Sequence, residues 1–201
     1  MKIVGVGCGP GMLTEEAIAA IGNAKLIYGS SRAIDLARDQ IVPGTAVHPI
    51  PDYRSLHTLP DEAVVLSTGD PMLAGLGRLG GEVIPGISSL QVAAARLHLP
   101  LVRVAVVDAH GRDRGQPLKD AGEELSRGKI VFLLADPGLD LGDIRAVLGG
   151  LSRPVKVYLC QDMGYPGEVV RELAPGELTG TLPGLYSLVL EPGRTNPAEG
   201  E

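Results

Sequence analysis

The stretch Ile3-Val4-Gly5-Val6-Gly7-Cys8-Gly9-Pro10-Gly11 is a short apolar segment that runs directly into glycines. Two later stretches share this arrangement. Ser67-Thr68-Gly69-Asp70-Pro71 follows the apolar residues 63–66, and Pro85-Gly86-Ile87-Ser88-Ser89 follows the strand-like residues 82–84. In an open parallel sheet, ligands bind in the crevice outside the carboxyl ends of the strands. Three turn-like loops at strand ends therefore predict one ligand site on a parallel α/β sheet.

The first half of the chain alternates strand and helix patterns. Expected strands cover residues 3–6, 25–28, 46–50, 62–67 and 82–84, and expected helices cover 14–21, 30–37, 73–79 and 88–97. Thr14 and either Ser30 or Ser31 are suitable N-cap residues for the first two helices. Such alternation is typical of a parallel sheet covered by helices. Pro100 breaks the pattern, so we expect an N-terminal α/β domain over residues 1–100.

The second half predicts a C-terminal domain over residues 101–191. Expected strands cover residues 102–107, 130–134 and 155–159, and expected helices cover 118–126 and 141–148. Two further strands, 169–173 and 185–190, are expected to form an antiparallel pair that closes an α+β domain with a hairpin. Residues 192–201 are rich in Pro, Gly and Glu and predict a disordered tail.

Composition excludes several classes of function. The chain of 201 residues has a net charge of −6, 3% aromatic residues and no Trp, which disfavours nucleic acid as a partner. Cys8 and Cys160 form no CxxC pair, so neither a disulfide framework nor a metal site is expected. No apolar run is long enough to span a bilayer and no secretion signal is visible, so we expect a cytoplasmic protein.

The glycine run fits neither of two common nucleotide motifs. A dinucleotide-binding GxGxxG places its third glycine three residues after the second, but here Pro10 or Met12 stands at that position. A phosphate-binding Walker loop requires Gly-Lys-Ser/Thr, which does not follow. An isolated GxG can also be a simple tight turn between strand and helix.

The other two loops each allow a structural and a functional interpretation. Asp70-Pro71 is a common turn pair, but Gly69 before it would let a ligand approach the backbone while the Asp70 carboxylate accepts hydrogen bonds from hydroxyls or an amine. Ser88 and Ser89 are suitable helix caps, and amides beside such caps can also meet a ligand. The combination of the three loops favours the functional interpretation.

Taken together, the three loops resemble those of the tetrapyrrole (corrin/porphyrin) methylase family, the class III S-adenosylmethionine-dependent methyltransferases. Asp108-Ala109-His110-Gly111-Arg112 and residues 161–168 (QDMGYPGE) look most like the family members that methylate C-5 of the precorrin ring in cobalamin biosynthesis. The resemblance covers nearly the whole chain. It implies a two-domain α/β fold, with a parallel-sheet α/β domain followed by an α+β domain with a mixed sheet.

The resemblance also implies which residues contact the cofactor, S-adenosylmethionine. They are Cys8 in the first loop, Gly69, Asp70 and Leu73 in or beside the second, Ser88 and Ser89 in the third, and Ala135 and Tyr186 in the C-terminal domain. The family usually has proline where Cys8 stands. A small residue such as Ala135 at the end of a buried strand is also ordinary packing.

Substrate residues follow from the chemistry of the implied ring. Its carboxylates suit arginines, so Arg112 and, beside Tyr53, Arg54 are candidates for orienting it, and Tyr165 joins this set. His110 is the candidate for orienting substrate or moving a proton, and it could also be a structural loop histidine. Methyl transfer itself depends mainly on alignment of nucleophile, methyl group and sulfur.

Other functions remain open at this point. The acceptor could be ribosomal RNA or a translation factor, as for a diphthine synthase-like enzyme, or the chain could be a non-catalytic nucleotide-binding module. The resemblance implies a homodimer. Because the chain is too short to hold a second activity that decarboxylates a side chain and methylates C-15, we expect a separate subunit for that step.

Overall fold

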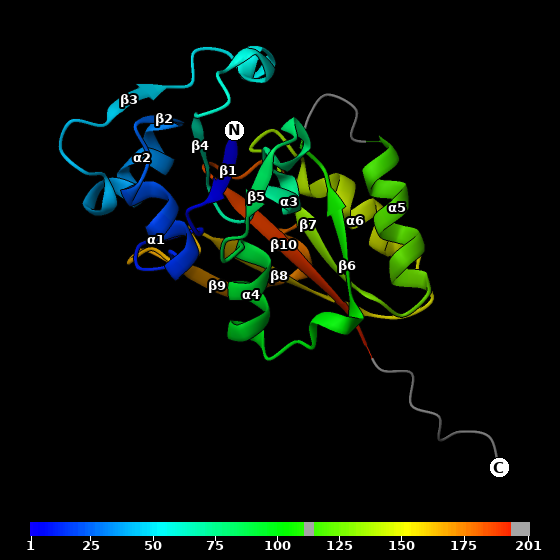
Figure 1. Ribbon diagram of the computed structural model, residues 1–201. Helices are drawn as coiled ribbons and strands as arrows, with labels where there is room; N and C mark the ends of the chain where they lie inside the picture. The colour runs from blue at the N-terminus through cyan, green and yellow to red at the C-terminus, as the bar shows by residue number, and fades with distance from the viewer. Residues whose placement is uncertain (111–114, 194–201) are drawn as a thin grey trace. The chain divides into compact units, whose positions relative to one another are not determined.

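The structure, a computed structural model, describes residues 1–110 and 115–193 (Figure 1). The chain divides into two compact units, Met1–Val92 and Ala93–Glu201, and the division falls inside helix α4 (Ser89–Leu97). The domain boundary expected near residue 100 lies just after this helix and stays a prediction.

The first unit contains a five-stranded sheet with the order β3-β2-β4-β1-β5. Its strands are β1 (Lys2–Gly5), β2 (Leu26–Gly29), β3 (Ala46–Pro49), β4 (Val64–Ser67) and β5 (Glu82–Ile84). Every pairing in this sheet is parallel, as predicted from the alternation. The inner strands β1 and β4 are almost completely buried, which explains their unbroken apolar sequence. Strands β4, β1 and β5 are neighbours, so their carboxyl ends lie together.

Helices α1 (Glu15–Gly22) and α2 (Ser31–Ala37) begin where the sequence predicted. The Thr14 hydroxyl accepts a hydrogen bond from the Ala17 amide at 3.1 Å, and Ser30 caps α2 through Ala33 at 3.2 Å. Three short 3₁₀ segments complete the unit: η1 (Arg38–Gln40), η2 (Tyr53–Thr58) and η3 (Gly77–Leu79).

The helix expected over residues 73–79 is wrong. Helix α3 covers only Pro71–Ala74, the chain leaves helical geometry at Gly75, and η3 begins at Gly77. A Cβ atom on Gly75 would lie 2.6 Å from the Ser67 hydroxyl and 3.1 Å from the Pro71 Cα. The chain therefore folds tightly against the β4 loop here, and that close approach breaks the helix.

The second unit contains a mixed five-stranded sheet with the order β6-β7-β10-β8-β9. Its strands are β6 (Val104–Asp108), β7 (Ile130–Leu134), β8 (Val155–Gln161), β9 (Val169–Leu173) and β10 (Tyr186–Pro192). Strands β6 and β7 are parallel, while β10 runs antiparallel to both β7 and β8. The expected α/β class, with a parallel first sheet and a mixed second sheet, is confirmed.

The hairpin expected between the last two strands is wrong. Strand β9 pairs with β8, whereas β10 lies between β7 and β8 and does not pair with β9. Burial gives the reason, because six of the seven residues of β10 are buried whereas β9 has one buried residue among five. The more apolar strand takes the centre of the sheet and the more polar one takes the edge.

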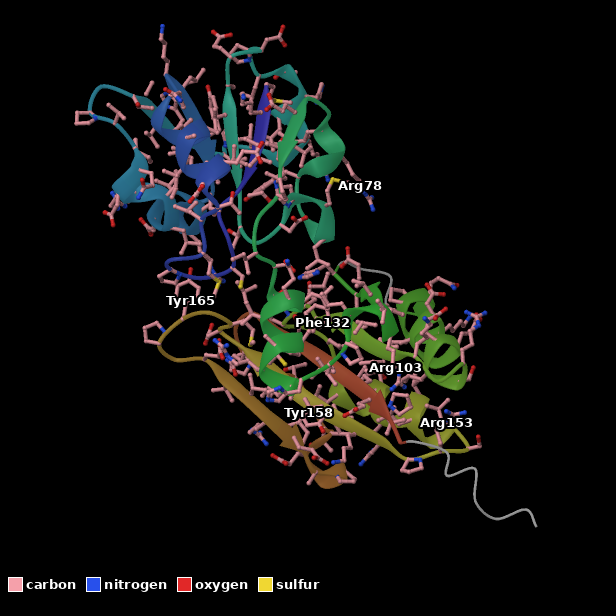
Figure 2. The ribbon with its side chains drawn as sticks, turned by 60° about the horizontal axis from the view of Figure 1, so that its bottom comes forward. Arg78, Arg103, Phe132, Arg153, Tyr158 and Tyr165 are labelled. Carbon is pink, nitrogen blue, oxygen red and sulfur yellow. The ribbon has the colours of Figure 1, made fainter. Side chains whose placement is uncertain are left out.

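Helices α5 (Gly115–Ser126) and α6 (Leu141–Gly149) pack with the second sheet in one apolar core. Phe132 on β7 is almost fully buried (Figure 2).

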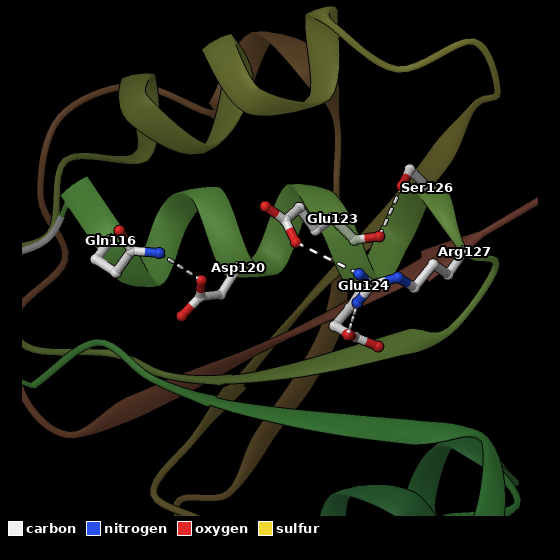
Figure 3. A network of polar contacts seen from close by, with 6 residues as sticks. All are labelled: Gln116, Asp120, Glu123, Glu124, Ser126 and Arg127. Atoms are coloured by element: carbon white, nitrogen blue, oxygen red, sulfur yellow. Dashed lines mark hydrogen bonds and ion pairs between the residues drawn. The ribbon is translucent and has the colours of Figure 1, made fainter.

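The outer face of α5 carries a polar network in which Arg127 pairs with Glu123 and Glu124, and Gln116 donates to Asp120 (Figure 3). Such exposed pairs contribute little stability.

Two segments of this unit differ from the expected boundaries. Residues Leu101–Arg103 form a 3₁₀ turn, η4, so β6 begins at Val104 rather than at residue 102. Strand β10 continues to Pro192, which pairs with Val155, and the Gly193 amide donates to the Pro154 carbonyl at 2.8 Å. Regular structure thus enters the segment expected to be a tail, whose residues 194–201 lie outside the described range. A further 3₁₀ turn, η5 (Pro175–Glu177), follows β9.

Within residues 1–110 and 115–193, no helix is both long enough and apolar enough to cross a lipid bilayer.

Candidate functional site

The three glycine-containing loops form one connected structure at the carboxyl edge of the first sheet. We call residues 5–11, 67–71 and 85–89 the glycine cradle. Three backbone hydrogen bonds join its loops: Val6 donates to Ser67 at 2.9 Å, Gly69 donates to Gly7 at 2.8 Å, and Cys8 donates to Ile87 at 2.9 Å. Each loop is therefore fixed by its neighbours rather than by its own turn alone.

Glycine is required in the cradle because the loops meet backbone to backbone. A Cβ atom on Gly5 would lie 2.6 Å from the Gly86 nitrogen and 2.8 Å from the Gly69 oxygen. A Cβ atom on Gly86 would collide with the same Gly69 oxygen. Gly69 itself has a φ of 72°, a left-handed conformation that favours glycine. The glycines thus serve the packing of three loops, which is more than a single strand-to-helix turn requires.

Asp70 connects two of these loops through its side chain. Its Oδ1 atom accepts a hydrogen bond from the Met72 amide at 2.8 Å, which caps α3, and its Oδ2 atom accepts one from the Gly86 amide at 3.1 Å. The residue is half-buried. Because a carboxylate oxygen has more than one acceptor position, both oxygens can still receive a ligand hydroxyl or amine. The turn role and the ligand role are therefore compatible.

Ser88 is a helix cap. Its buried hydroxyl donates to the Gln91 side chain at 2.8 Å and accepts from the Gln91 amide at 3.2 Å, while the Ser88 amide donates to the same side chain. This reciprocal arrangement is a capping box. Ser89 is half-buried and is the first residue of α4.

Cys8 and Leu73 complete the residues expected at this edge. The Cys8 side chain is buried, with its sulfur 3.6 Å from that of Met12, and Arg32 donates to the Cys8 carbonyl at 3.2 Å. Leu73 lies half-buried on α3. All six expected cofactor residues of the first unit therefore lie in or directly beside the glycine cradle.

Arg54 lies elsewhere in the same unit. It is exposed on η2, which follows β3, and one strand, β2, separates β3 from β4, whose loop belongs to the cradle. The Arg54 amide donates to Asp52 at 2.9 Å. Arg54 thus lies outside the three loops of the cradle.

The second sheet gathers the remaining expected residues at one edge, which we call the second edge. Strands β6, β7 and β8 end there and β10 begins there, since Asp108 is paired with Leu134, and Tyr186 with Gln161. The Ala109 amide extends this edge by donating to the Leu134 carbonyl at 3.0 Å. The second edge carries His110, Ala135, Tyr186 and the loop that contains Tyr165.

His110 and Asp108 form a hydrogen-bonded pair. The Asp108 Oδ1 atom lies 2.9 Å from the His110 Nδ1 atom and also accepts the His110 backbone amide at 3.0 Å. A carboxylate partner places the proton on Nδ1, which leaves Nε2 as the acceptor in the neutral ring. Asp108 was not among the residues expected to act at the site, although its position two residues before the histidine is a local signal for this pairing.

Ala135 and Tyr186 are buried at the second edge. The Tyr186 hydroxyl lies 3.4 Å from the carbonyl oxygens of both Asp136 and Leu139, in the turn that follows β7. Ala135 is 1% exposed and belongs to the core of this unit, so ordinary packing explains its small size.

Tyr165 lies on residues 162–168, which we call the tyrosine loop and which connects β8 to β9 (Figure 2). The Glu168 carboxylate accepts hydrogen bonds from the Gly164 amide at 2.7 Å and from the Arg96 Nε atom at 2.6 Å. Burial raises the pKa of Glu168, but the bonds from Arg96 and Gly164 and the charge of Arg96 outweigh it, so that the pKa lies below its ordinary value. Arg112, the first candidate for substrate binding, lies outside the described residues.

Comparison with known proteins identifies the family of the chain. Residues 2–179 match the model of the family described as Tetrapyrrole (Corrin/Porphyrin) Methylases. The chain belongs to this family. Its members are S-adenosylmethionine-dependent methyltransferases.

Three relatives bear on the chemistry of the family. A protein of Methanocaldococcus jannaschii named probable cobalt-precorrin-7 C(5)-methyltransferase is 27% identical over 198 residues, which cover 87% of this chain and 92% of that protein. The solved structure of a cobalamin biosynthesis precorrin-6Y methylase from Archaeoglobus fulgidus is 30% identical, with a TM-score of 0.74 and coverage of 97% and 98%. A Sinorhizobium protein named precorrin-6Y C(5,15)-methyltransferase (decarboxylating) is 29% identical over 85% of this chain, but only 44% of that longer protein is matched.

Proposed function

We propose that this tetrapyrrole methylase transfers a methyl group from S-adenosylmethionine to C-5 of a precorrin or cobalt-precorrin ring in cobalamin biosynthesis. The observation that carries the proposal is the glycine cradle, in a chain whose family match covers residues 2–179. The names of the Methanocaldococcus and Sinorhizobium relatives, which both include C-5, support this position.

The cradle residues suit the cofactor by their chemistry. When bound, S-adenosylmethionine supplies an electrophilic methyl group on a sulfonium. Gly69, where only the Ser88 Cα lies within 4 Å of an added Cβ, lets a ligand approach the backbone, and the two oxygens of Asp70 accept hydrogen bonds from its hydroxyls or amine. Cys8, Leu73, Ser88 and Ser89, in or beside the cradle, are further proposed cofactor contacts. Ala135 and Tyr186 are the contacts proposed in the second unit.

His110 acts in this proposal as the proton acceptor. An unsubstituted bridging carbon of a tetrapyrrole carries one hydrogen, and this hydrogen must leave as a proton once the new carbon–carbon bond has formed. The His110 Nε2 atom takes that proton, and Asp108 holds the ring by its Nδ1 atom at 2.9 Å and stabilises the imidazolium. Tyr165 and Arg112 orient the ring and its carboxylates in this proposal, and Arg54 is the weaker candidate because it is an exposed arginine, as most arginines are.

Titration and turnover test the proposal together. Calorimetry with S-adenosylhomocysteine, NAD and a guanine nucleotide should show binding of S-adenosylhomocysteine alone. Purified enzyme with labelled S-adenosylmethionine should methylate cobalt-precorrin-7 but neither ribosomal RNA nor a translation factor that carries a diphthamide precursor. Preference for NAD would refute the cofactor, methylation of either macromolecule would refute the substrate, and cofactor binding without any turnover would favour a non-catalytic module.

Two partners follow from the same proposal. We expect a homodimer, which sedimentation equilibrium of the purified chain would detect. The Sinorhizobium relative is named for both C-5 and C-15, and we propose that a separate subunit carries out the C-15 step beside this protein. Copurification from native extract checks this, and a C-15 methylation activity in the isolated chain would contradict it.

A further inference from the structure

The tyrosine loop is closed around one side chain, that of Glu168. The carboxylate of Glu168 accepts the Gly164 amide at 2.7 Å, and the Glu168 amide donates to the Tyr165 carbonyl at 2.9 Å. Two residues of the loop hold left-handed backbone, with a φ of 50° at Asp162 and 81° at Gly164. A non-glycine residue rarely adopts this conformation, so contacts from the surroundings must maintain it.

Arg96 fixes this loop from a distant part of the sequence. Its Nε atom donates to Glu168 Oε1 at 2.6 Å, and the two residues are 72 positions apart in the sequence. The Oε2 atom of the same carboxylate accepts the hydrogen bond from the Gly164 amide. The Glu168 side chain is only 18% exposed, and a charged side chain so far removed from water needs its partners. Removal of either partner therefore loosens the loop more than an ordinary surface ion pair would.

Tyr165 is the residue that this arrangement holds in place. Its backbone is bonded on both sides, since its amide donates to the Asp162 carbonyl at 3.0 Å and its carbonyl accepts from Glu168. A neighbouring bond, from the Asp162 amide to the Leu185 carbonyl at 3.5 Å, joins the loop to the chain just before Tyr186. The Glu168 carboxylate holds the backbone at Gly164, the residue directly before Tyr165, and so acts on Tyr165 through its neighbour in the loop.

We propose that Glu168 and Arg96 are positioning residues that set the affinity for the tetrapyrrole by holding Tyr165. This inference rests on the proposed function, because it assumes that the tyrosine loop contacts the tetrapyrrole substrate rather than the cofactor. Neither side chain needs to touch the substrate. A displacement of a contacting residue by about 1 Å is enough to reduce the efficiency of an enzyme severalfold or more.

The chain offers a matched control in Glu177. Its carboxylate also accepts one backbone amide, that of Ala174 at 2.8 Å, and one arginine, Arg171 at 2.7 Å. These contacts lie in the turn after β9, at the opposite end of the strand from the tyrosine loop. Glu177→Ala therefore removes an equivalent set of bonds without touching Tyr165.

Steady-state kinetics with cobalt-precorrin-7 tests the proposal. We expect Glu168→Ala to raise KM for the ring by about tenfold while kcat and the affinity for S-adenosylhomocysteine stay within about twofold of wild type. Glu168→Gln keeps an acceptor for the Gly164 amide and should restore part of the affinity. Glu177→Ala should leave KM unchanged.

Two further measurements separate positioning from a general loss of structure. In a Tyr165→Ala background, Glu168→Ala should raise KM no further, because it acts through Tyr165. Hydrogen exchange should accelerate in residues 162–168 of Glu168→Ala and stay unchanged there in Glu177→Ala. Equal KM in wild type and Glu168→Ala, or additive effects in the double variant, would overturn the positioning role alone. Absence of turnover by the wild type would instead overturn the proposed function and the substrate role with it.

Discussion

The glycine cradle and the second edge are held together by different kinds of contact. The glycine cradle is held by backbone contacts between three loops, and its glycines are in places where a single Cβ atom does not fit. The second edge is held by side chains, namely the pair of His110 with Asp108, the Tyr186 hydroxyl and the Glu168 carboxylate. Substitutions should therefore damage folding and binding together in the cradle but separate them at the second edge.

The strongest test of this contrast is Gly86→Ala. Its added Cβ collides with the Gly69 carbonyl, so the variant should lose about 3 kcal/mol of unfolding free energy and all measurable binding of S-adenosylhomocysteine. Urea unfolding and calorimetry check both effects. Gly149→Ala, where nothing lies within 4 Å of the added atom, is the control and should retain both properties. Normal cofactor binding by Gly86→Ala would refute a cradle built from backbone.

His110→Ala should separate catalysis from folding. Loss of a proton acceptor should lower kcat by about 100-fold, while cofactor affinity and stability remain close to wild type. Asp108→Asn should have a smaller effect of about tenfold, because it removes the charge that stabilises the imidazolium but leaves the proton acceptor itself in place. The control is His98→Asn, since His98 is exposed with a φ of 54° that asparagine tolerates. An unchanged kcat for His110→Ala would remove this residue from the mechanism.

Asp70→Ala should lower both the stability of the fold and the affinity for S-adenosylhomocysteine, but by less than Gly86→Ala does. Loss of its bonds to Met72 and Gly86 should lower the unfolding free energy by about 1–2 kcal/mol and the affinity for S-adenosylhomocysteine by about tenfold. Asp140→Ala removes a similar cap, a 2.8 Å bond to the Gly142 amide, on α6. The two variants should lose similar stability, and only Asp70→Ala should lose affinity. Equal affinities would assign Asp70 to the turn alone.

The smallest effect concerns pH at the second edge. Because the pKa of Glu168 is lower in the folded protein than its ordinary 4.5, the ionised carboxylate stabilises the fold above about pH 4.5 and this contribution is lost as pH falls through the folded pKa. Glu168→Gln should therefore be less stable than wild type at pH 7, by at most about 1 kcal/mol because Arg96 is half exposed. Urea unfolding between pH 7 and 3 should show this difference shrinking, and a constant difference would contradict it.

Local chemistry in the sequence was sufficient to predict the first sheet and most of the cradle. Thr14 and Ser30 mark helix starts, and the three loops follow directly from buried strands. The expected hairpin is wrong because the position of a strand in a sheet depends on how apolar the other strands are. Strand β10 is the more apolar of the two, so β10 and not β9 occupies the centre. The bond between Arg96 and Glu168 spans 72 residues, so no local pattern could indicate it.

The central position of β10 has a consequence for how this protein forms. Strands β7 and β8 cannot pair across the middle of their sheet until residues 186–192 have left the ribosome, because β10 supplies the hydrogen bonds on both sides. Before that moment both strands present open edges to solvent or to a chaperone. Completion of the second sheet, and with it of the edge that carries Tyr165 and Tyr186, is therefore a late event in synthesis.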